Sequence, residues 1–533
     1  MTATRPSHPT ARSLGRLVTA LTIVVASLLA SAPPGSARPQ PIVHDAAWSI
    51  YMDPKVYTTS KATYIGSVRS NGDVEATRVR TSDSSIQHTV LERSSMVDDH
   101  AAPGIVETPS GRVAYFWSGH NNRPVHYRVS ATSGSLTTMS SIRTLRGSGI
   151  ESRRSTYAQV VRLPGESRPY HLLTRLDDGN WWLTRSSDLR TWSPAIQLTR
   201  DSYPNPASGS LSPHFRPYIE VAGSSWRTLH IGITTGYTTS GSENSLYYLT
   251  LSKGALVDGS GKVLRTASQV SRLGRGVTPL DPREATRVTP WAGERRVQVF
   301  DLSVVAGTPS IGSSTYVADR GEHTVDVATA RRGRWSAASL TRLPTRPQSI
   351  ALGQRAARTA YVTLPRDGGS DLYRYTSTGP EEAWHPSAVH AGAPQIWTPA
   401  SAFGPGTGPG TPQLFWMRGH KTSVVRWTTD VWADVPARAP IQLTARYARR
   451  PAGGWTVHAT TRKGVRGAAL GDVTVRVRYL RKGSSTWRTI TRGTGSSGVA
   501  SIALPVLPRQ SSVRVDTVPT TTVGYGSLPT RTL

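Results

Sequence analysis

The chain has 533 residues, with 63 lysines and arginines against 33 aspartates and glutamates, a formal net charge of +30 and no cysteine. The missing cysteine excludes disulfides, thiol catalysis and thiolate metal sites, so the core alone must hold the fold. A surface this basic favours polyanionic partners such as acidic polysaccharide, cell-wall polymer or nucleic acid. The same charge also arises where arginine serves as a general solvent-facing residue.

Residues 1–37 have the pattern of a secretory signal peptide. Arg5, Arg12 and Arg16 precede an apolar run at 17–30, and small residues follow it. This run is too short for a stable transmembrane helix, and no later run reaches membrane length. We therefore expect a secreted, extracellular protein with no membrane span.

The remaining chain divides into a long and a short part. Residues 38–436 consist of short β-type segments separated by turns rich in Gly, Ser, Pro and Asp. They fall into seven units of roughly 40–60 residues, the size of a four-stranded propeller blade. We therefore expect an all-β fold whose main domain, 38–436, is a seven-bladed β-propeller. The units are 62–79, 104–128, 157–184, 218–250, 287–330, 348–375 and 393–427.

The sequence pattern changes at residue 437. Six alternating segments follow, at 441–446, 455–461, 473–480, 487–492, 499–504 and 512–517. This spacing predicts a small antiparallel sandwich of immunoglobulin-like type over 437–533. The segment carries 16 lysines and arginines against only Asp472 and Asp516, a net charge of +14. We expect it to bind an anionic glycan or a cell-wall polyanion, although a basic spacer would have the same composition.

Two histidines flank one predicted hairpin in the main domain. The stretch 104–117 between His100 and His120 predicts a short strand, a turn at Pro109, Ser110 and Gly111, and a second strand. Both histidines should therefore lie at the same open end of one sheet, where loops carry functional residues. A histidine in a loop is most often inert, so the pair indicates a functional site only together with the polar residues of the neighbouring units.

Tyrosines and arginines occupy strand ends in the next two units. Tyr157 opens the third unit, Arg175 ends its second strand, and Arg216 and Tyr218 open the fourth. Histidine and tyrosine can remove and donate protons, and arginine can pair with a carboxylate. Together these groups suit β-elimination at a uronic acid, in which the C5 proton leaves to a base and the C4 oxygen takes a proton. A single tyrosine at a strand start is more often a packing residue.

Several motifs resemble a bacterial neuraminidase-repeat (BNR) family that contains the seven-bladed ulvan lyases and rhamnosyl-glucuronate lyases. The motifs are Asp-Asp-His-Ala-Ala-Pro at 98–103, Gly-His-Asn at 119–121, Thr-Tyr-Ala-Gln at 156–159, the Asp-box-like Ser-Asp…Thr-Trp at 187–192 and Arg-Pro-Tyr at 216–218. The resemblance covers about residues 45–265, is thin from 266 to 436 and does not extend to the C-terminal domain. The histidine pair is its most specific part.

The resemblance implies a role for seven residues. His100 and His120 would form the catalytic centre, with Tyr157 or Tyr218 as acid or base; Arg175 would neutralise the substrate carboxylate, and Arg216 and Asn121 would assist binding. Ala101 and Ala158 depart from the family pattern, which has Asn and Pro there. We predict no cofactor and no metal ion.

This combination predicts a polysaccharide lyase that cleaves next to a uronic acid, on an ulvan-type or rhamnose-glucuronate linkage. One alternative is a glycoside hydrolase, which needs two carboxylates flanking the bond. Its candidates, Asp98, Asp99, Asp177, Asp178 and Asp188, form no convincing pair in the sequence. The other alternative is a non-catalytic propeller that binds anionic glycan or cell wall. A nucleic-acid partner is not expected, because the sequence shows export and no nucleic-acid-reading module.

Overall fold

The computed structural model describes most of the chain from residue 38 to 532. The described ranges are 38–81, 85–200, 203–204, 211–212, 217–224, 227–236, 245–289, 295–331, 333–347, 349–354, 358–378, 383–393, 395–404, 414–435, 441–450, 455–463, 474–484, 488–494, 496–497, 499–508, 510–517 and 531–532. The predicted signal peptide, 1–37, and the predicted binding residue Arg216 lie outside these ranges.

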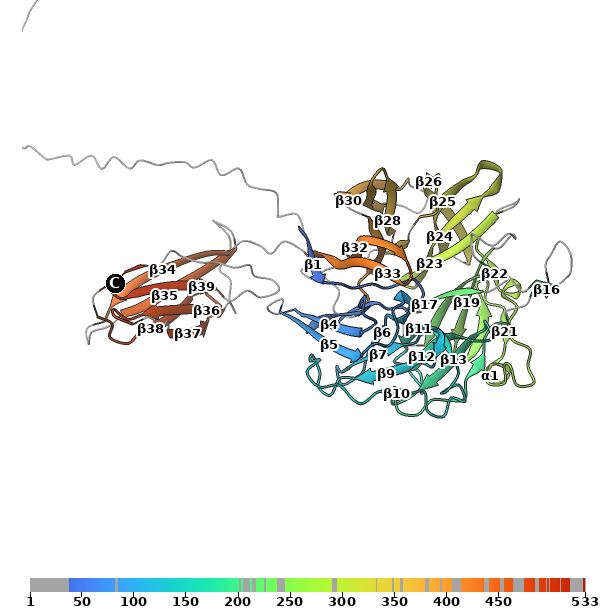
Figure 1. Cartoon of the computed structure of the whole chain (residues 1–533), viewed down its shortest axis with the longest axis horizontal. Helices are drawn as coiled ribbons and strands as arrows, with labels where there is room; N and C mark the ends of the chain where they lie inside the picture. The colour runs from blue at the N-terminus through green and yellow to red at the C-terminus, as the bar shows by residue number, and fades with distance from the viewer. Residues whose placement is uncertain are drawn as a thin grey trace, which may run out of the picture.

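Residues 38–435 form antiparallel sheets that follow one another along the chain (Figure 1). The first sheets contain β2 Val56–Thr58, β3 Ala62–Val68, β4 Val74–Arg80 and β5 Ile86–Glu92; then β6 Gly104–Glu107, β7 Val113–Trp117, β9 His126–Val129 and β10 Arg143–Thr144, with β8 His120–Arg123 beside them; then β11 Ser155–Arg162, β12 Tyr170–Leu176, β13 Trp181–Ser186 and β14 Ile196–Gln197.

The later sheets have the same pattern with longer strands. They contain β17 Tyr218–Ser224, β18 Thr228–Thr234, β19 Leu246–Ser252, β20 Ala255–Asp258, β21 Val263–Arg265 and β22 Thr286–Arg287; β23 Arg295–Val305, β24 Thr308–Val317, β25 Glu322–Arg331 and β26 Arg334–Leu343; β27 Ile350–Leu352, β28 Thr359–Arg366, β29 Gly369–Thr376 and β30 His385–Ala393; and β31 Ile396–Ser401, β32 Leu414–Ser423 and β33 Arg426–Val435. A short pair, β15 Tyr203–Pro204 and β16 Leu211–Ser212, stands apart.

The sheets close into a ring. Their first strands contact one another in chain order, from β2 to β6 and on through β11, β17, β23, β27 and β31. A parallel bridge between Tyr57 and Phe403 joins the last sheet back to the first. The N-terminal strand β1 (Arg38–Val43) also pairs with β33, placing Arg38 opposite Val435 (Figure 1). The two ends of this part of the chain therefore hold the ring together.

Burial decreases from the ring's centre to its rim. All seven residues of β3 are buried, whereas the edge strand β5 is mostly exposed or half-buried. Strands between two neighbouring sheets bury both faces, and edge strands carry polar side chains that discourage further pairing. The core includes the fully buried Trp48, Trp117, Trp181 and Trp416. Helix is nearly absent from the described residues: α1 (Ala267–Val270) has four residues, and the 3-10 turns are η1 (Asp99–Ala101), η2 (Pro282–Glu284) and η3 (Ala318–Arg320).

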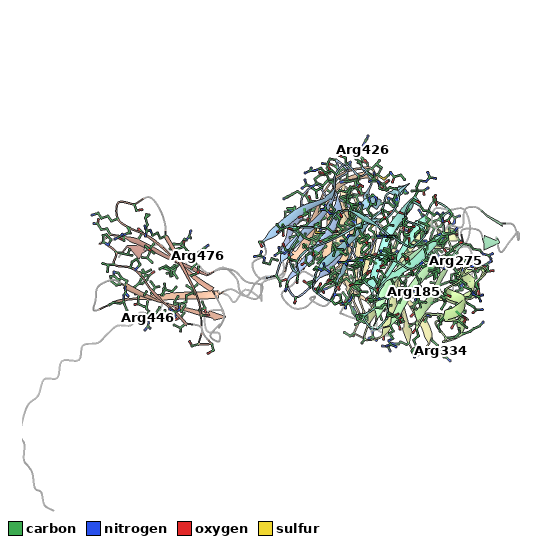
Figure 2. All side chains as sticks on the ribbon, turned by 90° about the horizontal axis from the view of Figure 1, so that it is seen from below. Arg185, Arg275, Arg334, Arg426, Arg446 and Arg476 are labelled. Carbon is green, nitrogen blue, oxygen red and sulfur yellow. The ribbon has the colours of Figure 1, made fainter. Side chains whose placement is uncertain are left out.

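The C-terminal strands form two further sheets with a core of their own. One contains β34 Ile441–Arg449, β35 Trp455–Lys463 and β38 Val499–Ala503; the other contains β36 Thr474–Leu480, β37 Arg488–Gly493, β39 Ser512–Thr517 and β40 Arg531–Thr532. Val457, Val477 and Val515 are fully buried in that core, while Arg446 and Arg476 lie on its outer sides (Figure 2). The all-β prediction is confirmed. The blade count, the immunoglobulin-like type and the domain limits remain predictions of the sequence.

No helix among the described residues is long and apolar enough to cross a membrane.

Candidate functional site

The predicted histidine hairpin forms as expected, with β6 and β7 joined through a turn at 108–112. His100 lies in the 3-10 turn η1 just before β6, and His120 begins β8 just after β7. Both histidines therefore come to one end of this sheet. A close approach between β6 and β11 brings that end to the next sheet, because a Cβ at Gly104 would lie 2.4 Å from the carbonyl oxygen of Ala158.

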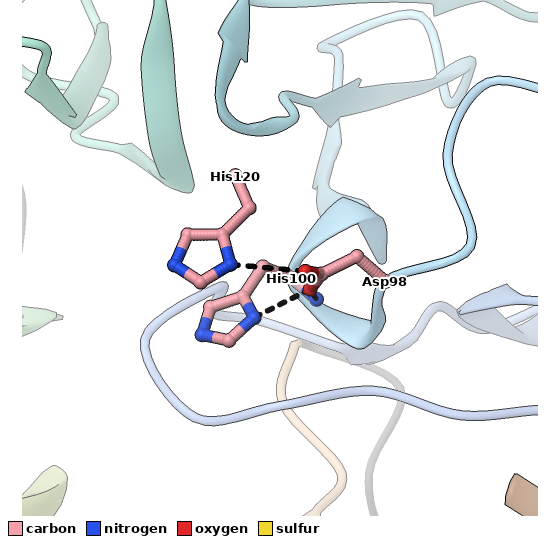
Figure 3. Close-up of side chains that lie close together, drawn as sticks. All are labelled: Asp98, His100 and His120. Atoms are coloured by element: carbon pink, nitrogen blue, oxygen red, sulfur yellow. Dashed lines mark hydrogen bonds and ion pairs between the residues drawn. The ribbon is translucent and has the colours of Figure 1, made fainter. Parts of the chain in front are cut away.

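One carboxylate holds both histidines (Figure 3). Asp98 Oδ1 lies 2.6 Å from His100 Nδ1, and Asp98 Oδ2 lies 2.9 Å from His120 Nδ1. The two imidazole rings stack with their centroids 4.1 Å apart. An ionised carboxylate only accepts hydrogen bonds, so both Nδ1 atoms must carry protons. The Nε2 atom of a neutral His120 is then a free base, and no hydrogen-bond partner for it lies in the described part of the chain.

The protonation of the pair differs from that of free histidine. Burial favours neutral His100, but hydrogen bonds from its ring to Asp98 and Asp99 outweigh burial and raise the pKa of His100 to about 9. Burial likewise favours protonated Asp98, yet the hydrogen bonds from His100 and His120 hold the pKa of Asp98 well below its usual range. At neutral pH His100 is therefore an imidazolium next to an ionised Asp98.

The 3-10 turn that carries His100 is also held by the last sheet of the ring. Lys421 Nζ in β32 donates to Asp99 Oδ2, and the Asp99 amide donates to the carbonyl of Val424 at 2.9 Å. Asp99 is fully buried and the Lys421 side chain is only 10% exposed. The last sheet of the ring thus determines where His100 lies.

A second network holds the segment that carries His120. Glu92 at the end of β5 accepts from the Trp117 indole at 2.6 Å and pairs with Arg123 at 3.1 Å. Burial favours protonated Glu92, but hydrogen bonds from His126 and Trp117 lower the pKa of Glu92 to about 2. Since Trp117 precedes His120 and Arg123 follows it, both sides of the His120 loop are tied to one ionised group.

The two predicted tyrosines and Arg175 lie together beside the histidines. The Tyr157 ring centroid is 5.3 Å from that of His100 and 6.5 Å from that of Tyr218. The Arg175 guanidinium lies 4.9 Å from the Tyr157 ring centroid and 5.2 Å from that of Tyr218. Arg175 is 7% exposed, and its Nη1 atom is buried with no hydrogen-bond partner in the described structure. The predicted residues from three successive sheets are therefore one cluster.

The backbone is strained at two of the predicted site residues. Tyr157 and Asn121 have φ values of 67° and 60°, in the left-handed region that is rare for residues other than glycine. The strain at Tyr157 coincides with a register shift between β11 and β12. Strained residues of this kind concentrate at functional sites. Asn121 itself is exposed and makes no side-chain hydrogen bond within the described structure.

Three further residues lie at the cluster that were not predicted from the sequence: Tyr51, Gln298 and Lys421. The Tyr51 ring lies 5.3 Å from Tyr157 and 5.0 Å from Tyr218, and its hydroxyl receives a hydrogen bond of 3.1 Å from Gln298. Tyr51 precedes the first predicted unit, and Lys421 is 322 residues from its partner Asp99. No local pattern marks either residue, because both reach the site through closure of the ring.

Asp98, His100 and His120 are close enough together to be tested as a metal site. Their geometry fits hydrogen bonding better: both Asp98 oxygens are at hydrogen-bond distance from an Nδ1 atom, and Nδ1 cannot hold a proton and a metal together. The arrangement provides a carboxylate-oriented histidine pair, a buried positive charge and two tyrosine hydroxyls.

The raised pKa of His100 makes stability depend on pH. A histidine whose folded pKa is about 9 and whose unfolded pKa is about 6.5 stabilises the fold fully below the unfolded value. That contribution, about 3 kcal/mol, is lost as pH rises toward 9 and beyond. We expect the free energy of unfolding in urea to fall between pH 6.5 and 9.5. The fall should be smaller in His100→Gln; equal slopes in the two proteins would contradict the assignment.

The model of the BNR repeat-containing family matches residues 62–285. Among solved structures, the chain is similar to an ulvan lyase of polysaccharide lyase family PL25 bound to a GlcA(1-4)Rha3S repeat, with 13% identity and a TM-score of 0.57 over 74% of this chain and 95% of that one. A second structure of a PL25 ulvan lyase matches over the same shares, with 13% identity and a TM-score of 0.56. No curated protein sequence matches. The predicted resemblance to a neuraminidase-repeat family is confirmed, and the ring of sheets is a β-propeller.

Proposed function

Starting from a β-propeller whose residues 62–285 match the BNR repeat-containing family, we propose that the chain is a secreted polysaccharide lyase. Its substrate is an acidic polysaccharide of the ulvan type or with a rhamnose-glucuronate linkage, cleaved next to the uronic acid by β-elimination. The observation that carries the proposal is the single cluster formed by Asp98, the two histidines, Tyr157 and Arg175. The solved ulvan lyases of the same fold support it.

His120 is the proposed base. Its Nδ1 proton is held by Asp98, its Nε2 lone pair is free, and its side chain is 38% exposed, so a substrate can reach it. His100 is buried and protonated at neutral pH, which suits it to stabilise negative charge rather than to remove a proton. His120 Nε2 takes the C5 proton of the uronate. The electrons of the broken C5–H bond form the C4–C5 double bond.

Tyr157 is the proposed acid. As the C4–O bond breaks, the tyrosine hydroxyl donates its proton to the leaving glycosidic oxygen. The Arg175 guanidinium beside both tyrosine rings then stabilises the tyrosinate, and its unpartnered Nη1 attracts the substrate carboxylate. Tyr218, which is half-buried, and the exposed Asn121 are proposed to bind the sugar chain. Arg216 is proposed for the same role from the sequence alone.

The five acids named for the hydrolase alternative are engaged elsewhere in the described structure. Asp177 and Asp178 both pair with Arg153 in a turn, and Asp188 caps the Asp-box turn. Asp98 and Asp99 both bond to His100 from the same turn, so they do not flank a space for a sugar. Canonical hydrolysis needs two carboxylates on opposite sides of the bond.

The test is the ultraviolet absorbance of the unsaturated uronate that β-elimination creates. The purified protein is incubated with a panel of uronic-acid polysaccharides that includes ulvan and gum arabic. Rising absorbance with one of them is the expected result. New reducing ends without absorbance would instead identify a hydrolase, and glycan binding without either signal would identify a binding protein.

The C-terminal domain is proposed as an accessory module for anionic glycan or cell-wall polyanion. Arg446, Arg488 and Arg492 are exposed on its strands, where guanidinium groups favour such partners. Changing all three to glutamine should shorten retention on an immobilised anionic polysaccharide at low salt, with unchanged thermal unfolding. Unchanged retention would identify the domain as a basic spacer.

A further inference from the structure

A second cleft opens at the other end of the β6–β7 hairpin. It is lined by the turn 108–112, by residues of and after β9, and by the Asp-box turn 187–190. β6 begins four residues after His100 and β7 ends three residues before His120, so the cleft lies one strand length, roughly 15 Å, from the histidines. Its volume of about 660 Å³ lies within the range of ordinary ligand-binding pockets. A short stretch of sugar units would fit.

Positive charge dominates the lining of this cleft. Arg112, Arg143 and Arg190 line it, with Arg112 and Arg190 exposed and Arg143 half-buried. None of the three forms an ion pair with any acidic residue the structure describes. The three guanidinium groups are therefore available to an anion from solution.

The one acidic residue in the lining is already engaged. Asp188 Oδ1 accepts hydrogen bonds from the amides of Arg190 at 2.8 Å and Thr191 at 3.0 Å, and Oδ2 accepts from the Thr191 hydroxyl. The carboxylate thus serves the Asp-box turn. It leaves the cleft with more positive than negative charge, beside hydroxyl groups such as those of Ser110 and Thr138.

We propose that this cleft is a second, non-catalytic binding site for an anionic polysaccharide. Its arginines hold sulfate or carboxylate groups through paired, charge-assisted hydrogen bonds, and its hydroxyls bond the sugar oxygens. The site holds a length of polymer while another length lies at the histidine cluster. The role of holding the polymer for the histidine cluster rests on the proposed function, whereas the binding of an anionic polysaccharide in this cleft does not.

The experiment is hydrogen–deuterium exchange on the full chain with ulvan oligosaccharides of defined length. A His120→Ala background prevents cleavage. The oligosaccharide is expected to protect amides at 108–112 and 187–191. Sulfated and desulfated oligosaccharides show which anion the arginines hold, and a neutral dextran should protect neither segment. Protection of 118–123 reports separately on the proposed histidine site, so each proposal can fail alone.

A matched pair of triple variants tests the arginines. Changing Arg112, Arg143 and Arg190 to glutamine should remove protection of both segments and weaken oligosaccharide binding about tenfold. Changing the exposed Arg272, Arg331 and Arg334 to glutamine removes the same charge elsewhere and should leave both signals intact. No protection at 108–112 and 187–191 in the parent, or equal losses in the two variants, would overturn the proposal.

Discussion

Replacing His120 with alanine is expected to lower turnover of the uronic-acid polysaccharide about 10²–10⁴-fold, the usual contribution of a general base. The side chain offers the one free Nε2 atom in the Asp98-linked pair, and its removal leaves only the buried imidazolium of His100. Initial rates of unsaturated product would measure the loss. KM should change little, since the histidine acts in the proton-transfer step and not in substrate binding.

His88→Ala is the matched control for that experiment. His88 in β5 also contacts a carboxylate, with its Nδ1 atom 3.0 Å from Glu75, and its side chain is 41% exposed. It does not touch the tyrosines or Arg175 in the described contacts. We expect its turnover to stay near that of the parent. A comparable loss in the two variants would show that His120 acts through the loop's structure and not as the base.

Replacing Arg175 with methionine is expected to reduce kcat about 10²–10³-fold, the usual cost of removing one preorganised group that stabilises transition-state charge. The guanidinium is the charge closest to both tyrosine rings, and methionine keeps much of its apolar volume. Arg175→Lys should restore part of the rate, because lysine keeps the charge and loses the planar fork. Rates on ulvan-type substrate and thermal unfolding would be measured together.

Arg128→Met controls for the loss of an arginine that is hydrogen-bonded to the backbone away from the tyrosines. Its guanidinium donates to the carbonyls of Ser140 at 2.6 Å and Leu91 at 2.9 Å, in the sheet that precedes that of Arg175. This variant should lose stability without losing kcat. If Arg175→Met kept its kcat, the guanidinium would be a packing residue beneath the tyrosines and the proposed charge stabilisation would be wrong.

Local pattern predicted the early strands closely. The predicted unit 62–79 became β3 and β4, and the strand, turn and strand predicted within 104–117 became β6 and β7. The Asp-box turn also formed as expected, with Trp192 3% exposed beneath it. These signals are local: alternation along one strand, and turn residues whose side chains bond the adjacent backbone.

The later units were harder to delimit from the sequence. The unit predicted at 287–330 corresponds to a sheet from Arg295 to Leu343, whose outer strand β26 lies beyond the predicted end. β26 is mostly exposed or half-buried and rich in polar residues. An edge strand needs no apolar alternation, so the pattern that marks an inner strand is missing there.

The sequence by itself determined the all-β class, the histidine hairpin and the residue types available for proton transfer. Only the tertiary structure decided that one carboxylate, Asp98, orients both histidines, that Arg175 lies against both tyrosines, and that Tyr51 and Lys421 complete the cluster. The physical reason is distance along the chain. Strand patterns repeat every two residues, whereas the site forms where loops from separate sheets meet after β1 and β33 have closed the ring.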